Sequence, residues 1–332
     1  MNLLLFGEST KGTLLSSIAS GVPTEYTIAL VDPYSHTVPG QTPGVITRAR
    51  RLLARRHTGD RLVEAVADHT PDATIIIKGR GLDAASIEVA GQTTFTVLYL
   101  PDNPFWAGSE QAHLVEVMHT VDLVVLFSHR QAELVSQHWP GVTTAVVPFG
   151  YDARWFPVSP VERERDLDLV FVGVWSPRRE RFLRELVDLD LSVIGQGWQG
   201  RLDGKGADAV FGSSAGALLA RAKVSINVLH PQCAGAHNMR TREITASGAA
   251  QLTEPGTDGT PLRDGAGAVW FSTPGELRER AGDLVADDAL RTSVAIDGQD
   301  LTRGQDYRHF VHELLEAVGR ITDNVRNRSS HR

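Results

Sequence analysis

The sequence predicts an α/β protein built from two doubly wound parallel sheets, each covered by helices. Three observations carry this prediction. A length of 332 residues exceeds what one hydrophobic core usually supports, so two domains are expected. Short apolar runs bounded by Gly, Pro or Asp alternate with longer amphipathic stretches, which is typical of a parallel sheet. This alternation occurs once in each half of the chain.

Six apolar runs predict the strands of the first half. They are Asn2–Phe6, Tyr26–Val31, Thr74–Lys78, Phe95–Leu100, Val121–Phe127 and Thr143–Pro148. Helical stretches separate them, and the clearest is Arg48–His69, in which Leu52, Leu62 and Val66 share one face. Residues 1–155 are therefore expected to form one doubly wound domain.

The second half repeats this pattern. Strands are expected at Leu167–Val172, Leu191–Ile194, Val224–Leu229, Ala249–Thr253 and Ala268–Phe271, with helices near Arg178–Leu186, Ser214–Ala222 and Arg240–Ser247. The charged segment Ser159–Asp166 is expected to be an exposed linker between the halves. We expect residues 156–305 to form the second domain. From Leu301 an apolar stripe predicts one amphipathic helix, so residues 306–332 are expected to be a terminal helix with a frayed polar tail.

Composition and charge exclude several classes of function. A net charge of -7 provides no broad basic surface for a nucleic-acid polymer. Cys233 is the single cysteine and cannot form an internal disulfide, so a reducing, cytoplasmic compartment fits best. No apolar run approaches the roughly 20 residues of a transmembrane segment. The pairs Asp166/Asp168 and Asp188/Asp190 precede strands without a third ligand nearby, so neither a metal ion nor another cofactor is expected.

Three segments resemble glycosyltransferase sequences. Val146–Pro157 resembles the interdomain crossing of GT-B glycosyltransferases, in which a strand ends in Pro-x-Gly-x-Asp and continues to Phe-x-Pro. Leu169–Arg181 resembles the first strand, glycine turn and basic helix start of a donor-binding domain. Met239–Glu254 is similar to the Arg-Thr-x-Glu-(apolar)-x-Ala-x-Gly pattern of spore-maturation CgeB-like glycosyltransferases, a GT-B group.

The resemblance implies both a fold and an activity. The fold would be GT-B, with two Rossmann-like doubly wound domains facing across a cleft. The activity would be transfer of a sugar from a nucleotide-diphosphate sugar, UDP by default, to a small-molecule or glycan acceptor without a metal. Two other functions are open: a nucleotide-sugar epimerase of the same fold, and a non-catalytic nucleotide-sugar-binding protein. The sequence leaves the stereochemical outcome and the oligomeric state open.

Donor-binding residues are expected in the second half. The resemblance implies that Glu243, just inside a predicted helix, accepts the ribose hydroxyls. Arg240 and the backbone N–H groups at that helix start are expected to hold the diphosphate. The other donor-side candidates are Gly173, Arg178, Arg181, His237, Asn238 and Thr241. In a related retaining family, a Glu eight residues before the ribose-binding Glu contacts the sugar. Gly235 occupies that position here, so His237 or Asn238 is expected nearest the sugar.

Acceptor-side residues are expected at the edge of the first sheet where its strands end, because ligands of parallel sheets bind there. Asp102 is the first candidate for the general base, and His129 is the alternative. The remaining acceptor-side candidates are Gly7, Ser9, Thr10, Asn103 and Trp106. The first loop, Gly7–Thr13, does not match the Walker phosphate-binding pattern, because its lysine precedes the second glycine.

Overall fold

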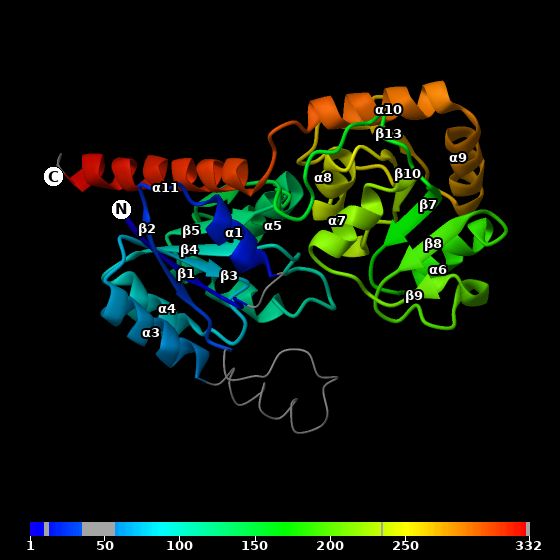
Figure 1. Cartoon of the computed structure of the whole chain (residues 1–332). Coiled ribbons are helices and arrows are strands. Elements are labelled where there is room, and N and C mark those ends of the chain that lie inside the picture. Colours follow the sequence, from blue (N-terminus) through cyan, green and yellow to red (C-terminus); the bar gives the residue numbers. More distant parts are fainter. Residues whose placement is uncertain (10–12, 35–56, 234, 330–332) are drawn as a thin grey trace. The chain divides into compact units, whose positions relative to one another are not determined.

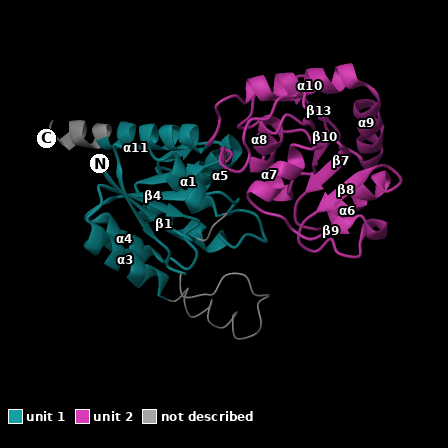
Figure 2. Ribbon diagram, viewed as in Figure 1, with its two compact units in different colours: residues 1–148, 307–332 teal, residues 149–306 magenta. Residues whose placement is uncertain are grey.

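The computed structural model describes residues 1–9, 13–34, 57–233 and 235–329, with side chains described up to residue 322. The chain divides into two compact units (Figure 2). Unit 1 comprises residues 1–148 and 307–332, and unit 2 comprises residues 149–306. Each unit contains one sheet whose neighbouring strands are parallel (Figure 1). The prediction of an α/β protein with two parallel sheets is confirmed.

The sheet of unit 1 has the strand order β2-β1-β3-β4-β5-β6. Its strands are β1 (Asn2–Phe6), β2 (Thr27–Val31), β3 (Ala73–Ile77), β4 (Phe95–Leu100), β5 (Leu123–Leu126) and β6 (Thr144–Val146). All six were predicted, with small shifts at their ends. The strand order reverses between β1 and β3, which makes this pair the topological switch point where doubly wound sheets bind ligands.

Helices cover both faces of this sheet. They are α1 (Leu14–Gly21), α3 (Thr58–His69), α4 (Ala84–Gly91), η1 (Ala112–Thr120), α5 (His129–His138) and α11 (Tyr307–Ser329). Leu3 and Leu5 of β1 pack with α1 and α11, whereas Leu4 and Phe6 pack with α3 and α4. Both faces are therefore apolar, which explains the unbroken apolar runs of the strands. Of the predicted helix over residues 48–69, α3 forms the last part, and residues 48–56 lie outside the described residues.

The last helix begins later than predicted. A helix from Leu301 was expected, but α10 ends at Leu301 and α11 begins at Tyr307. Gly304 lies between them with φ +72°, a left-handed conformation that interrupts helical geometry. After this break α11 packs on α1, and the ring of Phe310 lies 5.1 Å from that of Tyr99 in β4. The chain thus returns to unit 1 after completing unit 2.

The sheet of unit 2 has the order β12-β13-β11-β10-β7-β8-β9. Its strands are β7 (Leu167–Val172), β8 (Leu191–Ile194), β9 (Gly206–Ala207), β10 (Ala222–Asn227), β11 (Ala250–Thr253), β12 (Arg263–Asp264) and β13 (Gly267–Trp270). Its helices are α6 (Pro177–Leu183), η2 (Arg184–Leu186), η3 (Leu202–Gly204), α7 (Ser213–Leu219), η4 (Pro231–Cys233), α8 (Met239–Ala246), α9 (Pro274–Ala286) and α10 (Asp288–Leu301). The two-residue edge strands β9 and β12 were not predicted, because so short a strand leaves no pattern.

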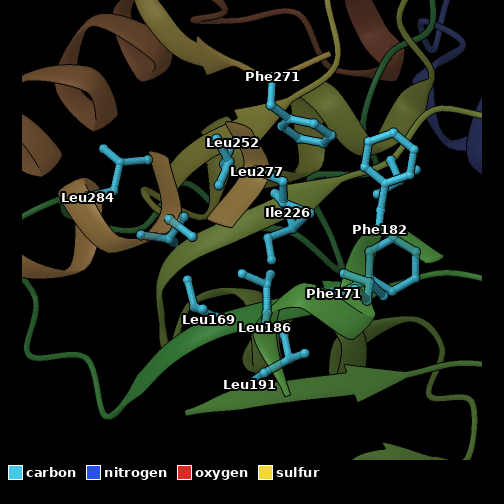
Figure 3. Close-up of a cluster of buried hydrophobic side chains, with 14 of the residues drawn as sticks. Leu169, Phe171, Phe182, Leu186, Leu191, Ile226, Leu252, Phe271, Leu277 and Leu284 are labelled. Atoms are coloured by element: carbon cyan, nitrogen blue, oxygen red, sulfur yellow. The ribbon is translucent and has the colours of Figure 1, made fainter. Parts of the chain in front are cut away.

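The main core of unit 2 lies on one face of this sheet (Figure 3). Phe171 of β7 belongs to it, and Phe182 of α6 and Phe271 pack there with ring centroids 5.6 Å apart. A second cluster, including Val170 of β7 and Ile244 of α8, fills the opposite face. Helix α8 is thus held against the sheet by its apolar side, which fixes the position of the polar residues at its start.

The charged segment 159–166 lies inside unit 2. The boundary between the two units falls earlier in the sequence, between Pro148 and Phe149. The Arg165 guanidinium donates to four carbonyl oxygens, those of Pro160, Ala220, Ala222 and Ser247, at 3.0–3.2 Å. These bonds fasten the segment to the start of one strand, β10, and to the ends of two helices, α7 and α8, so its charge does not make it a free linker.

Candidate functional site

The end of β7 is fixed by the loop that follows β8. The carbonyl oxygen of Gly173 accepts a hydrogen bond from the Trp198 indole N–H at 2.7 Å. A Cβ atom on Gly195 would lie 1.9 Å from this oxygen, so only glycine permits so close an approach. The predicted glycine turn therefore exists, and its carbonyl is already used within the protein.

Arg178 is held by a carboxylate at the adjacent strand end. Helix α6 begins at Pro177, and the Ser176 hydroxyl caps it by accepting from the Arg179 N–H at 3.2 Å. The Arg178 guanidinium reaches both oxygens of Glu254, one of them at 2.9 Å, and this bonding raises its pKa. Glu254 follows β11 directly and also accepts from the Leu229 N–H at 2.8 Å. The pair therefore joins α6 to the ends of β10 and β11.

A cavity of about 290 Å³ lies beside this pair. It is lined by Arg178, Leu229, His230, Pro231, Cys233, Gly235, Glu254, Pro255 and Ser272. Gly235 has φ +89°, and the space where its Cβ would point is open. The only donor-side candidate in this lining is Arg178. Sequence reasoning missed Glu254 as a site residue, although its position immediately after a strand was a usable signal.

The three arginines that follow β7 have different environments. Arg178 faces the cavity, whereas Arg179 donates to the carbonyl oxygens of Val228 and Val174 at 3.1 and 2.8 Å. Burial lowers the pKa of Arg179. Arg181 is exposed, and its guanidinium lies 5.6 Å from the centre of the Phe182 ring. Of the three, Arg178 is thus the one placed to meet a ligand in the cavity.

Arg240 and Glu243 form another Arg–Glu pair near the start of α8, with Arg240 in the first turn and Glu243 three residues later. Their nearest nitrogen and oxygen atoms are 2.6 Å apart, and the side chains are 21% and 9% exposed. Burial raises the pKa of Glu243, an effect that the Arg240 charge opposes and that Asp152 increases. The Arg240 guanidinium also lies 5.9 Å from the centre of the Phe156 ring. The two residues singled out by the motif are therefore in contact with each other and largely buried.

A buried hydrogen-bond network holds the segment before α8. Asn227, the last residue of β10, exchanges amide hydrogen bonds of 3.1 and 3.3 Å with Asn238. It also donates to the Thr241 hydroxyl at 3.2 Å, and that hydroxyl lies 2.7 Å from Nδ1 of His237. Because Asn238 is bonded to Asn227, its side chain does not cap α8. The backbone N–H groups at the start of α8 are therefore not capped by this side chain and can donate hydrogen bonds to a bound anion.

His237 is neutral at pH 7. It is 3% exposed, and burial lowers its pKa to about 4. Its ring lies against Gly256, where a Cβ atom would approach it to 2.6 Å. His237 therefore offers hydrogen-bonding nitrogen atoms but no positive charge to a ligand.

Asp102 lies at the corresponding edge of unit 1, where Gln111 and Lys78 contact it. Gln111 donates to Asp102 Oδ2 at 2.7 Å, and the Lys78 ammonium lies 3.4 Å from the same oxygen. Lys78 follows β3 directly, and Gln111 is fully buried. Sequence reasoning missed both. Neither carries a motif, and only the fold brings residues 78, 102 and 111 together.

The other acceptor-side candidates surround this edge. Gly7 leaves little room for a side chain, because a Cβ atom would lie 3.0 Å from the Ile77 carbonyl oxygen. Ser9 donates to Asp32 through its N–H and its hydroxyl at 2.9 and 3.1 Å, and Thr10 lies outside the described residues. Asn103 is buried and accepts from the Phe105 N–H, whereas Trp106 is 36% exposed. His129 is the exposed first residue of α5.

Within the described ranges, no group of three His, Cys, Asp or Glu side chains is arranged to hold a metal ion. The acidic pairs found in the sequence contact cations instead. Asp166 pairs with Arg221, Asp168 with Lys223 and Asp188 with Arg278. The Arg278 contact lowers the pKa of Asp188 to about 2. Among the described helices, none is both long and apolar enough to span a bilayer.

Comparison with known proteins finds a family match over part of the sequence and a shared fold. Residues 178–316 match the glycosyl transferase-like family. No curated protein matches the chain in sequence.

Three solved structures resemble the whole chain. Anabaena HepE in complex with UDP-glucose has a TM-score of 0.65 at 15% identity, covering 96% of this chain and 99% of that one. Sucrose-phosphate synthase from Thermosynechococcus elongatus has a TM-score of 0.65 at 14% identity, covering 98% and 100%. A glycosyltransferase from Rickettsia africae has a TM-score of 0.67 at 10% identity, covering 97% and 99%. At these identities the likeness concerns the fold, and the chain has the GT-B fold.

Proposed function

We propose that the protein is a glycosyltransferase that takes its sugar from a UDP-sugar and needs no metal ion. One observation carries this proposal. The segment that matches the glycosyl transferase-like family contains the Arg178–Glu254 and Arg240–Glu243 pairs, and these lie beyond the ends of parallel strands, where such sheets bind ligands. The HepE structures, which hold UDP-glucose or UDP, support UDP as the nucleotide. The motif over residues 239–254 supports a place in the CgeB-like group.

The donor-side roles follow from charge. As the bond between sugar and diphosphate breaks, negative charge grows on the diphosphate, and positioned cations stabilise it. Arg178 and Arg240 supply these cations, together with backbone N–H groups at the start of α8. Glu243 accepts the two ribose hydroxyls, and the Arg240 charge helps to keep its carboxylate ionised despite burial. Asn238, Thr241 and the neutral His237 hold the intervening loop.

The acceptor-side roles belong to unit 1. Asp102 accepts the proton of the acceptor hydroxyl while the oxygen of that hydroxyl bonds to the sugar carbon. His129 is the alternative base. Gly7, Ser9, Thr10, Asn103 and Trp106 contribute to acceptor binding.

Calorimetric titration of the full-length protein with UDP, GDP, dTDP and pyrophosphate tests the donor site. We expect UDP to bind most tightly and the Arg178→Met and Glu243→Gln variants to bind it at least about tenfold more weakly, the effect of one charge-assisted hydrogen bond. Arg221→Met is the matched control, because it breaks an Arg–Asp pair at the other end of the strands. Equal weakening in all three variants, or none in the first two, contradicts the site assignment.

Incubation with a UDP-sugar alone separates the reaction classes. A transferase releases UDP, by hydrolysis if water is the only acceptor, whereas an epimerase returns an altered UDP-sugar. Tight UDP binding with neither product identifies a non-catalytic binding protein.

A further inference from the structure

We propose that Lys78 is a positioning residue of the acceptor side, which fixes the Asp102 carboxylate in place and keeps a positive charge beside it. This inference rests on the proposed function, in which Asp102 is the base. Three observations carry it: the place of Lys78 in the sheet, its backbone conformation and its contacts.

The place of Lys78 is the ligand-binding point of the unit 1 sheet. Lys78 follows β3, and its N–H continues the ladder by donating to the Tyr99 carbonyl of β4 at 3.0 Å. Strand β3 has β1 on its other side, and the strand order reverses between these two. Crevices at such reversals, outside the carboxyl ends of strands, are where doubly wound sheets bind ligands. Lys78 thus stands between this switch point and the end of β4, which carries Asp102.

The backbone of Lys78 is strained. Its φ is +67°, in the left-handed region, where a side chain crowds the backbone and glycine is strongly preferred. Gly79 and Gly81, with φ of +56° and +78°, provide that freedom in the same turn. A glycine at position 78 would therefore make the turn without strain. Strain of this kind is concentrated at functional sites. The presence of a lysine here, where glycine would form the same turn, therefore calls for an explanation other than the turn itself.

A contribution to folding stability does not explain the presence of Lys78. The Lys78 ammonium lies 3.4 Å from Asp102, and the two side chains are 33% and 29% exposed. Ion pairs this exposed contribute little to folding, less than the left-handed strain removes. The nearby Arg80 is engaged elsewhere, with Glu110 at 2.7 Å and Glu8 at 3.9 Å. Lys78 therefore places a cation beside Asp102.

The contacts explain what Lys78 does. Asp102 Oδ2 accepts a hydrogen bond from the Gln111 side-chain amide at 2.7 Å and lies 3.4 Å from the Lys78 ammonium. Gln111 is fully buried, and its own N–H is held by the Ser109 hydroxyl at 3.1 Å. The buried Gln111 amide and the charged Lys78 ammonium together set the direction of the carboxylate. Loss of the ammonium would leave the carboxylate in place but less well oriented to receive a proton.

The test compares four variants of the full-length protein by UDP release from UDP-glucose in water and by thermal unfolding. Lys78→Met should lower kcat at least about tenfold while UDP affinity and KM change little, and Lys78→Arg should recover most of the rate. Lys78→Gly should lose as much activity yet unfold at a temperature equal to the wild type or about 2–4 °C higher, because it relieves the strain. Lys223→Met is the control, since Lys223 pairs with Asp168 at nearly the same exposure, 33% and 30%, far from either site.

The outcomes separate this inference from the proposed function. If Lys78→Gly unfolds at a clearly lower temperature, Lys78 has a structural role, and if Lys78→Met keeps the wild-type kcat, Lys78 has no role in the reaction. In either case the inference is wrong while the transferase proposal stands. If the wild-type protein neither binds UDP nor releases it from UDP-sugars, the proposed function fails and the role of Lys78 fails with it. A rate lost equally in the Lys223→Met control also overturns the inference.

Discussion

Replacing His237 by glutamine should remove a large part of the pH dependence of stability. The unfolded imidazole titrates near pH 6.5, whereas burial lowers the folded pKa to about 4. Between these values the unfolded state binds a proton that the folded state excludes, so stability falls as pH falls through this window. Each pH unit inside it changes the unfolding free energy by up to about 1.4 kcal/mol. From about pH 7.5 to about pH 5, His237 alone should therefore remove about 2 kcal/mol.

Urea denaturation of the wild type and the His237→Gln variant at the two pH values measures this difference. The stability gap between the proteins should narrow on acidification by about 2 kcal/mol, because only the wild type meets the cost of keeping a buried histidine neutral. Comparing slopes with pH removes any constant effect of the substitution on packing. Thr241→Val is the control: it removes the hydroxyl 2.7 Å from Nδ1 but retains the buried ring, so it should keep the wild-type slope. Parallel curves for wild type and His237→Gln would refute the reasoning.

Two further substitutions test the packing that supports the sites. Gly195→Ala should destabilise the protein by roughly 3 kcal/mol or more, because the added Cβ would lie 1.9 Å from the Gly173 oxygen. Gly200→Ala has open space at its Cβ but a left-handed φ of +70°, so in the same urea denaturation it should lose only the left-handed strain of about 1–2 kcal/mol. Phe310→Ala should lose about 3–5 kcal/mol, because its 1%-exposed ring packs on Tyr99, and a loss below about 1 kcal/mol would show that α11 is not part of the unit 1 core.

The strands of both sheets were readable from the sequence because of where they lie. A parallel strand covered on both faces needs apolar side chains at nearly every position, so it appears as an unbroken run. Edge strands such as β9 and β12, two residues long, leave no such signal. The start of α11 was placed too early because, among the five residues between α10 and α11, only the left-handed Gly304 signals the break.

The candidate site was less readable, because its contacts join residues distant in sequence. Glu254 lies 76 positions from Arg178, and the sequence around either residue gives no indication that they form a pair. Asn227 likewise reaches Asn238 and Thr241 only because β10 ends beneath the start of α8. The α8 motif was found because it is local. Its partners were missed because hydrogen bonding between elements depends on the packed fold.

The return of α11 to unit 1 has a consequence for how the protein is made. Tyr307, Phe310 and Leu314 fill one face of the unit 1 sheet, yet they are synthesised after every residue of unit 2. A nascent chain can therefore complete unit 2 while the first unit still exposes an apolar face around Leu3 and Tyr99. The half that is translated first therefore completes its core last, and until α11 is made it exposes apolar surface of the kind that favours aggregation.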